Sequence, residues 1–238
     1  MTDRPVLVLL PGLLCDETVW QAQIAAFGSE WQIQVVDLRG YNSFDAMAEA
    51  VLEQAPPRFA LAGHSMGGRV ALEVFRQAPD RIERLALLSA GVHPVLEGEA
   101  EKRQQLIALA WRDGIEALAR QWIPPTLHPD KRHDQALVEQ MIAMWCRSTP
   151  EIHESQIRAA LTRRDARPLL ASIRCPTLVL GGIDDSWASA ASQQDIAAAI
   201  PGCRLALIPE CGHMVTMEQP EAVNAHLRDW LAATGDRA

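Results

Sequence analysis

Short apolar runs alternate along this chain with longer stretches in which apolar residues recur every three or four positions. The short runs are typical of strands buried on both faces, and the longer spacing is typical of helices that cover a sheet. Strands are expected at residues 6–10, 32–37, 58–63, 83–89, 176–181 and 203–208. Helices are expected at residues 17–27, 44–54, 66–77, 189–199 and 219–233. The pattern predicts an α/β fold with a mostly parallel sheet of about six strands flanked by helices.

The strand pattern stops between residues 92 and 167, where the chain is polar and has helical spacing. We therefore expect an all-helical cap, residues 92–167, inserted into a core that comprises residues 1–91 and 168–238. Within the cap, helices are expected at residues 97–112, 114–122, 130–147 and 150–163.

The composition is that of an ordinary globular protein: of 238 residues, 48% are hydrophobic and 22% are charged. A formal net charge of −8 argues against nucleic acid as a partner, because binding to phosphates needs a basic face. The five cysteines are odd in number and include no C-x-x-C pair, which favours reduced thiols over disulfides or a zinc site. We expect no metal and no organic cofactor.

No apolar stretch approaches the ~20 residues of a membrane span, and the first apolar run, residues 6–10, is too short for a signal peptide. The expectation is a cytoplasmic protein without a membrane partner. The sequence leaves its oligomeric state open.

The most specific chemical signal is the run Gly63-His64-Ser65-Met66-Gly67, a G-x-S-x-G between an expected strand and an expected helix. A serine on so sharp a turn needs glycines beside it, because its strained backbone leaves no room for neighbouring Cβ atoms. The turn exposes the serine hydroxyl at the end of the sheet. Ser65 is therefore the candidate nucleophile, on a nucleophile elbow.

An activated serine needs a base to take its proton and a third group to orient that base. His213 lies in the loop after the last expected strand, and Asp184 and Asp185 follow the strand before it. All these positions fall at the carboxyl ends of strands, at the same edge of the sheet as Ser65. Because the serine, the histidine and an acid meet at this edge, we expect a catalytic triad there.

With these residues in place, the chain resembles the α/β-hydrolase family over nearly its whole length. Residues 11–14, with Trp20 nearby, resemble the family's oxyanion loop, and residues 37–41 resemble its turn after the next strand. Residues 212–213 followed by residues 218–220 resemble its histidine loop. The resemblance implies the α/β-hydrolase fold with a helical cap, and strands ordered second, first, third, fourth, fifth, sixth across the sheet.

The resemblance places the orienting acid at Asp185, three residues after Gly182, with Asp184 as the alternative one residue away. The family often has a proline a few residues later. This chain has Ser186-Trp187-Ala188 there, so its turn is expected to differ. The implied chemistry is attack by the serine on a carbonyl carbon, with the histidine as base and the aspartate holding the imidazole.

The resemblance also implies an oxyanion hole formed by the backbone N–H groups of Leu13 and Met66. We interpret His64 and Cys15 as structural, with the His64 side chain directed away from the bound carbonyl. Large apolar side chains of the cap should help to line an acyl pocket, since ligand sites are commonly apolar. The residues expected at the substrate are Leu14, His93, Trp122, Met144 and Trp145.

The leading hypothesis is a serine hydrolase that cleaves a carboxylic ester or related small-molecule acyl substrate through an acyl-enzyme. A rival uses the same triad for C–C bond cleavage or elimination on an anionic metabolite. A third hypothesis is a ligand-binding protein of this fold with little turnover, which the complete triad disfavours. The rival would need an inward-facing arginine among Arg103, Arg112, Arg120, Arg147, Arg163 and Arg164.

Overall fold

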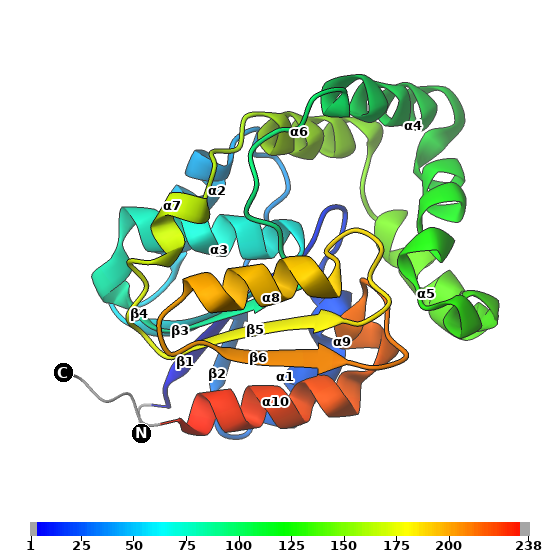
Figure 1. The fold of residues 1–238 in the computed structure, drawn as a ribbon. Coiled ribbons are helices and arrows are strands. Elements are labelled where there is room, and N and C mark those ends of the chain that lie inside the picture. The colour runs from blue at the N-terminus through cyan, green and yellow to red at the C-terminus, as the bar shows by residue number, and fades with distance from the viewer. Residues whose placement is uncertain (1–3, 234–238) are drawn as a thin grey trace.

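Six strands form a single parallel sheet in the computed structural model, which describes residues 4–233 (Figure 1). The strand order is β2-β1-β3-β4-β5-β6, and all five neighbouring pairs are parallel. The predicted fold class and strand order are therefore confirmed, and the expected strand ends agree to within two residues. The strands are β1 Val6–Leu10, β2 Gln32–Val35, β3 Phe59–His64, β4 Ile82–Leu88, β5 Thr177–Gly182 and β6 Arg204–Ile208.

Helices cover both faces of the sheet, which explains why the central strands are apolar throughout. Along β1 the side chains alternate: Val8 and Leu10 pack toward one face, and Leu7 and Leu9 toward the other. The first face is covered by α2 Phe44–Gln54, α3 Met66–Gln77 and α8 Ala190–Ala199. The second is covered by α1 Gln21–Phe27, α9 Val215–Glu218 and α10 Pro220–Ala232.

The chain between β4 and β5 is helical, as its spacing predicts. Its helices are α4 Glu99–Trp122, α5 Gln135–Trp145, α6 Pro150–Leu161 and α7 Arg167–Leu170. Gly114 interrupts α4 with a φ of 86°, a left-handed value that glycine adopts at little cost, and this is where the sequence predicts a break. Asp134 and Thr149 cap α5 and α6, because their side chains accept the backbone N–H groups of Leu137 and Ile152.

Figure 1 shows α4 and α5 on the side toward which the strand arrows point, where the carboxyl ends of the strands meet. Buried side chains of this segment, such as Ala110, Leu118 and Met141, belong to the same hydrophobic cluster as Leu7 and Leu9 of β1. The insertion is thus packed onto the sheet's own core. Its division from the core as a separate cap domain stays a prediction.

Short 3₁₀ turns complete the chain at Glu17–Trp20, Pro79–Arg81, Pro124–Thr126 and Pro129–His133. Within residues 4–233, none of the helices is both long enough and apolar enough to cross a membrane.

Candidate active site

Ser65 lies on a strained turn between β3 and α3, with a φ of 54° and a ψ of −114°. Its N–H donates to the carbonyl of Leu88 on the neighbouring strand, over 2.9 Å. A Cβ on Gly63 would collide with the carbonyl of Gly67, and a Cβ on Gly67 with the carbonyl of Leu10. The glycines of the motif are therefore needed to bring the turn this close to β1, and the strain is held by the surrounding backbone.

Three of the predicted residues come together in one hydrogen-bonded line. Nε2 of His213 lies 2.8 Å from Oγ of Ser65, and Nδ1 of His213 lies 2.8 Å from Oδ2 of Asp185. The side chains of His213 and Asp185 are 6% and 0% exposed, so water competes little for these bonds. The arrangement can move the serine proton to the imidazole and hold the imidazolium beside a carboxylate.

Asp185, rather than Asp184, reaches the histidine. The Oδ1 atom of Asp185 accepts the backbone N–H groups of Trp187 and Ala188, both over 2.8 Å. Burial opposes ionisation, but His213 and these hydrogen bonds outweigh it and hold the pKa of Asp185 below its usual value. The Asp184 side chain is 40% exposed and lies 3.7 Å from Nε2 of His128, away from the line.

Two aromatic side chains flank the His213 ring. The Trp187 ring is centred 5.1 Å from it, and the His64 ring 5.3 Å from it. Nε2 of His64 donates to the carbonyl of His213 over 2.9 Å, and burial lowers the pKa of His64 to about 4. His64 is therefore neutral at pH 7. It positions the histidine loop, which is the structural role that the sequence analysis gave it, and it also lines the cavity.

A buried carboxylate holds the loop that carries His213. Glu218 is 4% exposed, and its oxygens accept the backbone N–H groups of His128, Gly212 and Met214 over 2.8, 3.1 and 3.0 Å. Burial raises the pKa of Glu218. Because His128 belongs to the insertion, this one carboxylate joins the insertion to both sides of the histidine.

The two backbone N–H groups expected at an oxyanion hole lie in the loop after β1 and at the first residue of α3. Within residues 4–233 neither the N–H of Leu13 nor that of Met66 donates to a protein acceptor. The next residue, Leu14, has a φ of 58°, and its N–H donates to Oε1 of Gln156 on α6 over 2.9 Å. Gln156 therefore fixes the loop that presents Leu13, a role that no sequence signal indicated.

A cavity of about 1010 Å³ opens over Ser65 and His213. Of the predicted pocket and oxyanion residues, five line it and two do not. Leu14 is buried in the core at 1% exposure, where the turn at this residue, with its left-handed φ of 58°, places its side chain. Met144 is fully buried, because the face of α5 toward the cavity carries Met141 and Trp145, four residues apart. The five that line it are Leu13, Met66, His93, Trp122 and Trp145.

Cys15 also lines the cavity, but burial raises the pKa of its thiol to about 12, so it is not a thiolate at pH 7. Nowhere in residues 4–233 do three or more histidine, cysteine or acidic side chains gather so as to hold a metal ion. The groups that are arranged for proton transfer at the cavity are Ser65 and His213, with Asp185 hydrogen-bonded behind the histidine.

The arginines of the insertion divide into two groups. Of the six arginines that the sequence analysis named, Arg103 and Arg163 line the cavity. The other four of these six pair with carboxylates at the surface: Arg112 with Asp113, Arg120 with Glu116 and Glu139, Arg147 with Asp16, and Arg164 with Asp45.

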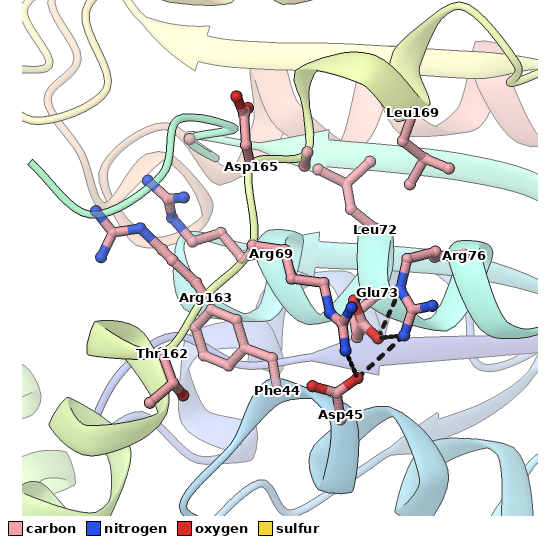
Figure 2. Close-up of a pocket in the computed structure, with 13 residues that line it drawn as sticks. Phe44, Asp45, Arg69, Leu72, Glu73, Arg76, Thr162, Arg163, Asp165 and Leu169 are labelled. Atoms are coloured by element: carbon pink, nitrogen blue, oxygen red, sulfur yellow. Dashed lines mark hydrogen bonds and ion pairs between the residues drawn. The ribbon is translucent and has the colours of Figure 1, made fainter.

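Arg69 on α3 lines the cavity as well, and the sequence analysis did not single it out. A separate pocket of only about 60 Å³ lies beyond Arg69 and Arg163 (Figure 2). Among the charged side chains that line it, Arg76 binds Glu73 and Asp45, and Arg164 binds Asp45. It is too small for an organic substrate. The large cavity, which Ser65 and His213 line, is the candidate site.

Comparison with known proteins agrees with this geometry. Residues 7–226 match the alpha/beta hydrolase family. A pimeloyl-(acyl-carrier protein) methyl ester esterase of Nitrosomonas europaea is 27% identical over 240 residues, 92% of each chain. A putative carbamate hydrolase of Serratia proteamaculans is 28% identical over 251 residues, 97% of this chain and 92% of that one.

Solved structures show the same fold. A thermophilic esterase from Thermogutta terrifontis, solved with malate bound, superposes with a TM-score of 0.87 at 28% identity, over 95% of this chain and 89% of that one. An enol-lactonase from Burkholderia xenovorans superposes with a TM-score of 0.88 at 24% identity, over 97% and 92% of the two chains. The second likeness concerns the fold alone.

Proposed function

The chain belongs to the α/β-hydrolase family, and we propose that it is a serine hydrolase that cleaves a carboxylic ester or related acyl compound. Ser65 is the nucleophile, His213 the base and Asp185 the orienting acid. The observation that carries this proposal is the line Ser65 Oγ, His213 and Asp185, with both of its hydrogen bonds at 2.8 Å. A hydroxyl in this arrangement can be deprotonated as it attacks.

In the first half-reaction, His213 takes the Ser65 proton while Oγ attacks the carbonyl carbon of the ester. The N–H groups of Leu13 and Met66 receive the oxyanion, and α3 adds the positive end of its dipole because Met66 is its first residue. The C–O bond to the alcohol then breaks, and His213 gives its proton to the leaving oxygen. Water attacks the acyl-enzyme by the same route and releases the acid.

The relatives support hydrolysis of an ester or a similar acyl bond. Two of them are named as esterases and one as a putative carbamate hydrolase, and each of these covers nearly the whole chain. Both substrate classes, esters and carbamates, place a carbonyl carbon before the nucleophile. At identities of 27% and 28% they leave the substrate of this chain to be determined by experiment.

Turnover of p-nitrophenyl butyrate by the wild type and two serine variants tests the proposal. Ser65→Ala should lower kcat by about 10⁴-fold or more, because the three residues act as a unit. Ser172→Ala is the matched control, since Ser172 is exposed and does not line the cavity, and its activity should equal that of the wild type. Near-normal turnover by Ser65→Ala would remove the proposed function.

C–C bond cleavage or elimination on an anionic metabolite remains a second candidate, because guanidinium groups of Arg69, Arg103 and Arg163 line the same cavity. It predicts that labelling of Ser65 by a fluorophosphonate is retained while esters of every length turn over negligibly. Efficient hydrolysis of any ester in a graded series favours the first function instead.

A further inference from the structure

One wall of the cavity carries more positive charge than its carboxylates balance. Three partly or fully buried guanidiniums, those of Arg69, Arg103 and Arg163, share this wall with one partly buried carboxylate, that of Glu99. The four exposed charged residues of the lining cancel, two of each sign: Glu97, Lys102, Arg167 and Asp195. Two positive charges are therefore left over at this wall, in a protein whose formal net charge is −8.

Arg69 is the guanidinium without a counter-ion. Within residues 4–233 it makes no ion pair, and its donors contact only His93, at the carbonyl over 2.9 Å and at Nε2 over 3.0 Å. Burial, reinforced by Arg163, lowers the pKa of Arg69 to about 9, so the group remains charged at pH 7. An unpaired cation in such a place is costly, and an anion that binds beside it offsets the cost.

The neighbouring arginines are fixed in place, which makes the wall preorganised. Arg163 is paired with Glu99 at 2.5 Å and also donates to the His93 carbonyl over 3.2 Å. Arg103 lies 3.5 Å from the same carboxylate and stacks over the Trp122 ring at 5.5 Å. Figure 2 shows the guanidiniums of Arg69 and Arg163 together, and both reach the carbonyl of His93.

The wall is close to the nucleophile. Arg69 follows Ser65 by four residues along α3, and the backbone N–H of Arg69 donates to the backbone carbonyl of Ser65 over 3.3 Å. One helical turn separates them, a rise of about 6 Å along the axis. Both line the same cavity, so one small molecule can reach the serine with a carbonyl group and the arginine with an anionic group.

We propose that Arg69, supported by Arg103 and Arg163, is a subsite for a carboxylate on the substrate. The preferred substrate is then the half-ester of a short dicarboxylic acid, bound with its ester at Ser65 and its free carboxylate at Arg69. A planar guanidinium suits this role because it binds a carboxylate through two parallel N–H donors. This inference rests on the proposed function, since it names the acyl part of the ester.

The test compares monomethyl and dimethyl esters of succinate, glutarate and adipate, with hydrolysis followed by proton release. In the wild type, at least one monomethyl ester should exceed its dimethyl ester in kcat/KM by about 10- to 100-fold, the value of a charge-assisted hydrogen bond. Arg69→Met should remove most of that ratio, chiefly through KM. Arg69→Lys should restore part of it, because the charge remains.

Arg164→Met is the matched control, because Arg164 is an exposed arginine nearby that pairs with Asp45 and does not line the cavity. It should leave the ratio unchanged. Equal rates for the two esters of every diacid in the wild type would overturn the subsite while leaving ester hydrolysis intact. So would a ratio that survives Arg69→Met.

A binding measurement separates failure of the subsite from failure of the proposed function. Calorimetric titration of the free dicarboxylates into Ser65→Ala protein requires no turnover. Binding that weakens about 10-fold or more in the Ser65→Ala, Arg69→Met double variant would support the subsite even if no ester is hydrolysed. Equal affinity in both, or no binding to either, would overturn it. Where Arg69→Met fails to fold, Arg69→Gln replaces it in both measurements.

Discussion

The substitution Asp185→Asn isolates what the acid of the triad contributes, because the surrounding hydrogen bonds determine how the new amide must lie. Oδ1 of Asp185 accepts two backbone N–H groups, from Trp187 and Ala188, both over 2.8 Å. Only the oxygen of an asparagine can accept those bonds, so its NH₂ group must face Nδ1 of His213. Nδ1 of the imidazole then accepts a hydrogen bond from this NH₂ group, and the ring proton lies on Nε2. Because the protonated Nε2 faces Ser65, the imidazole cannot take the serine proton.

The expected loss in kcat/KM is about 10⁴-fold, which corresponds to about 5 kcal/mol of transition-state stabilisation. The fold should be retained, because the variant is nearly isosteric and keeps both backbone hydrogen bonds. The assay is kcat/KM for p-nitrophenyl butyrate from about pH 5 to pH 9, with the thermal midpoint measured alongside.

Asp184→Asn is the matched control one residue away, since Asp184 is 40% exposed and its carboxylate lies beside His128, whereas Asp185 is the one that bonds His213. It should change kcat/KM by no more than about threefold, as expected for removal of a surface charge. A larger loss at Asp184 than at Asp185 would refute the assignment of the acid. Near-normal activity of Asp185→Asn would refute the reasoning about the tautomer.

Three further predictions concern the histidine loop, the insertion and the pocket. Glu218→Ala leaves three backbone N–H groups without their acceptor, so it should lower the free energy of unfolding by about 3 kcal/mol and should also lower kcat. Glu218→Gln should lose less of both. An unchanged thermal midpoint of Glu218→Ala would contradict this prediction. Burial lowers the pKa of His153 from 6.5 to about 4, so the unfolded chain binds more protons between those values and stability falls as the pH falls through them. His153→Leu should therefore reduce the difference in thermal midpoint between pH 7 and pH 5, and an undiminished difference would exclude His153 as its source. Butyrate esters should exceed acetate esters by about fourfold in kcat/KM per added CH₂, a gain that should end where a longer acyl chain reaches the charged wall. Rates independent of length would argue against an apolar site beside Ser65.

The sheet and the serine turn could be predicted because their causes are local. Apolar runs mark the buried strands, and Gly63 and Gly67 are required by backbone contacts next to Ser65. The break in the helix at Gly114 could be predicted because its cause is also local: glycine adopts a positive φ at little cost.

The pocket depends on how the insertion packs, and the sequence does not show this. The spacing of the apolar residues places Met141, Met144 and Trp145 on one helix. The rotation of α5 about its own axis decides that Met144 faces the core while Met141 and Trp145 face the cavity. Gln156 is remote in sequence from Leu14, whose N–H it accepts, so no motif connects them. In the sequence Arg69 is an ordinary polar position of the helix, because the sequence does not show that the arginine makes no ion pair within residues 4–233 and instead contacts His93.

Labelling with a fluorophosphonate, followed by peptide mass spectrometry, tests the central claim most directly, because the reagent reacts only with an activated nucleophile. The wild type should take up one equivalent, on the peptide that contains Ser65, and labelling should fall by orders of magnitude in His213→Ala. Ser172, exposed and without a base, should stay unmodified. Modification at another residue, or labelling of Ser65 that is undiminished in His213→Ala, would contradict the assignment of Ser65 as a serine activated by His213.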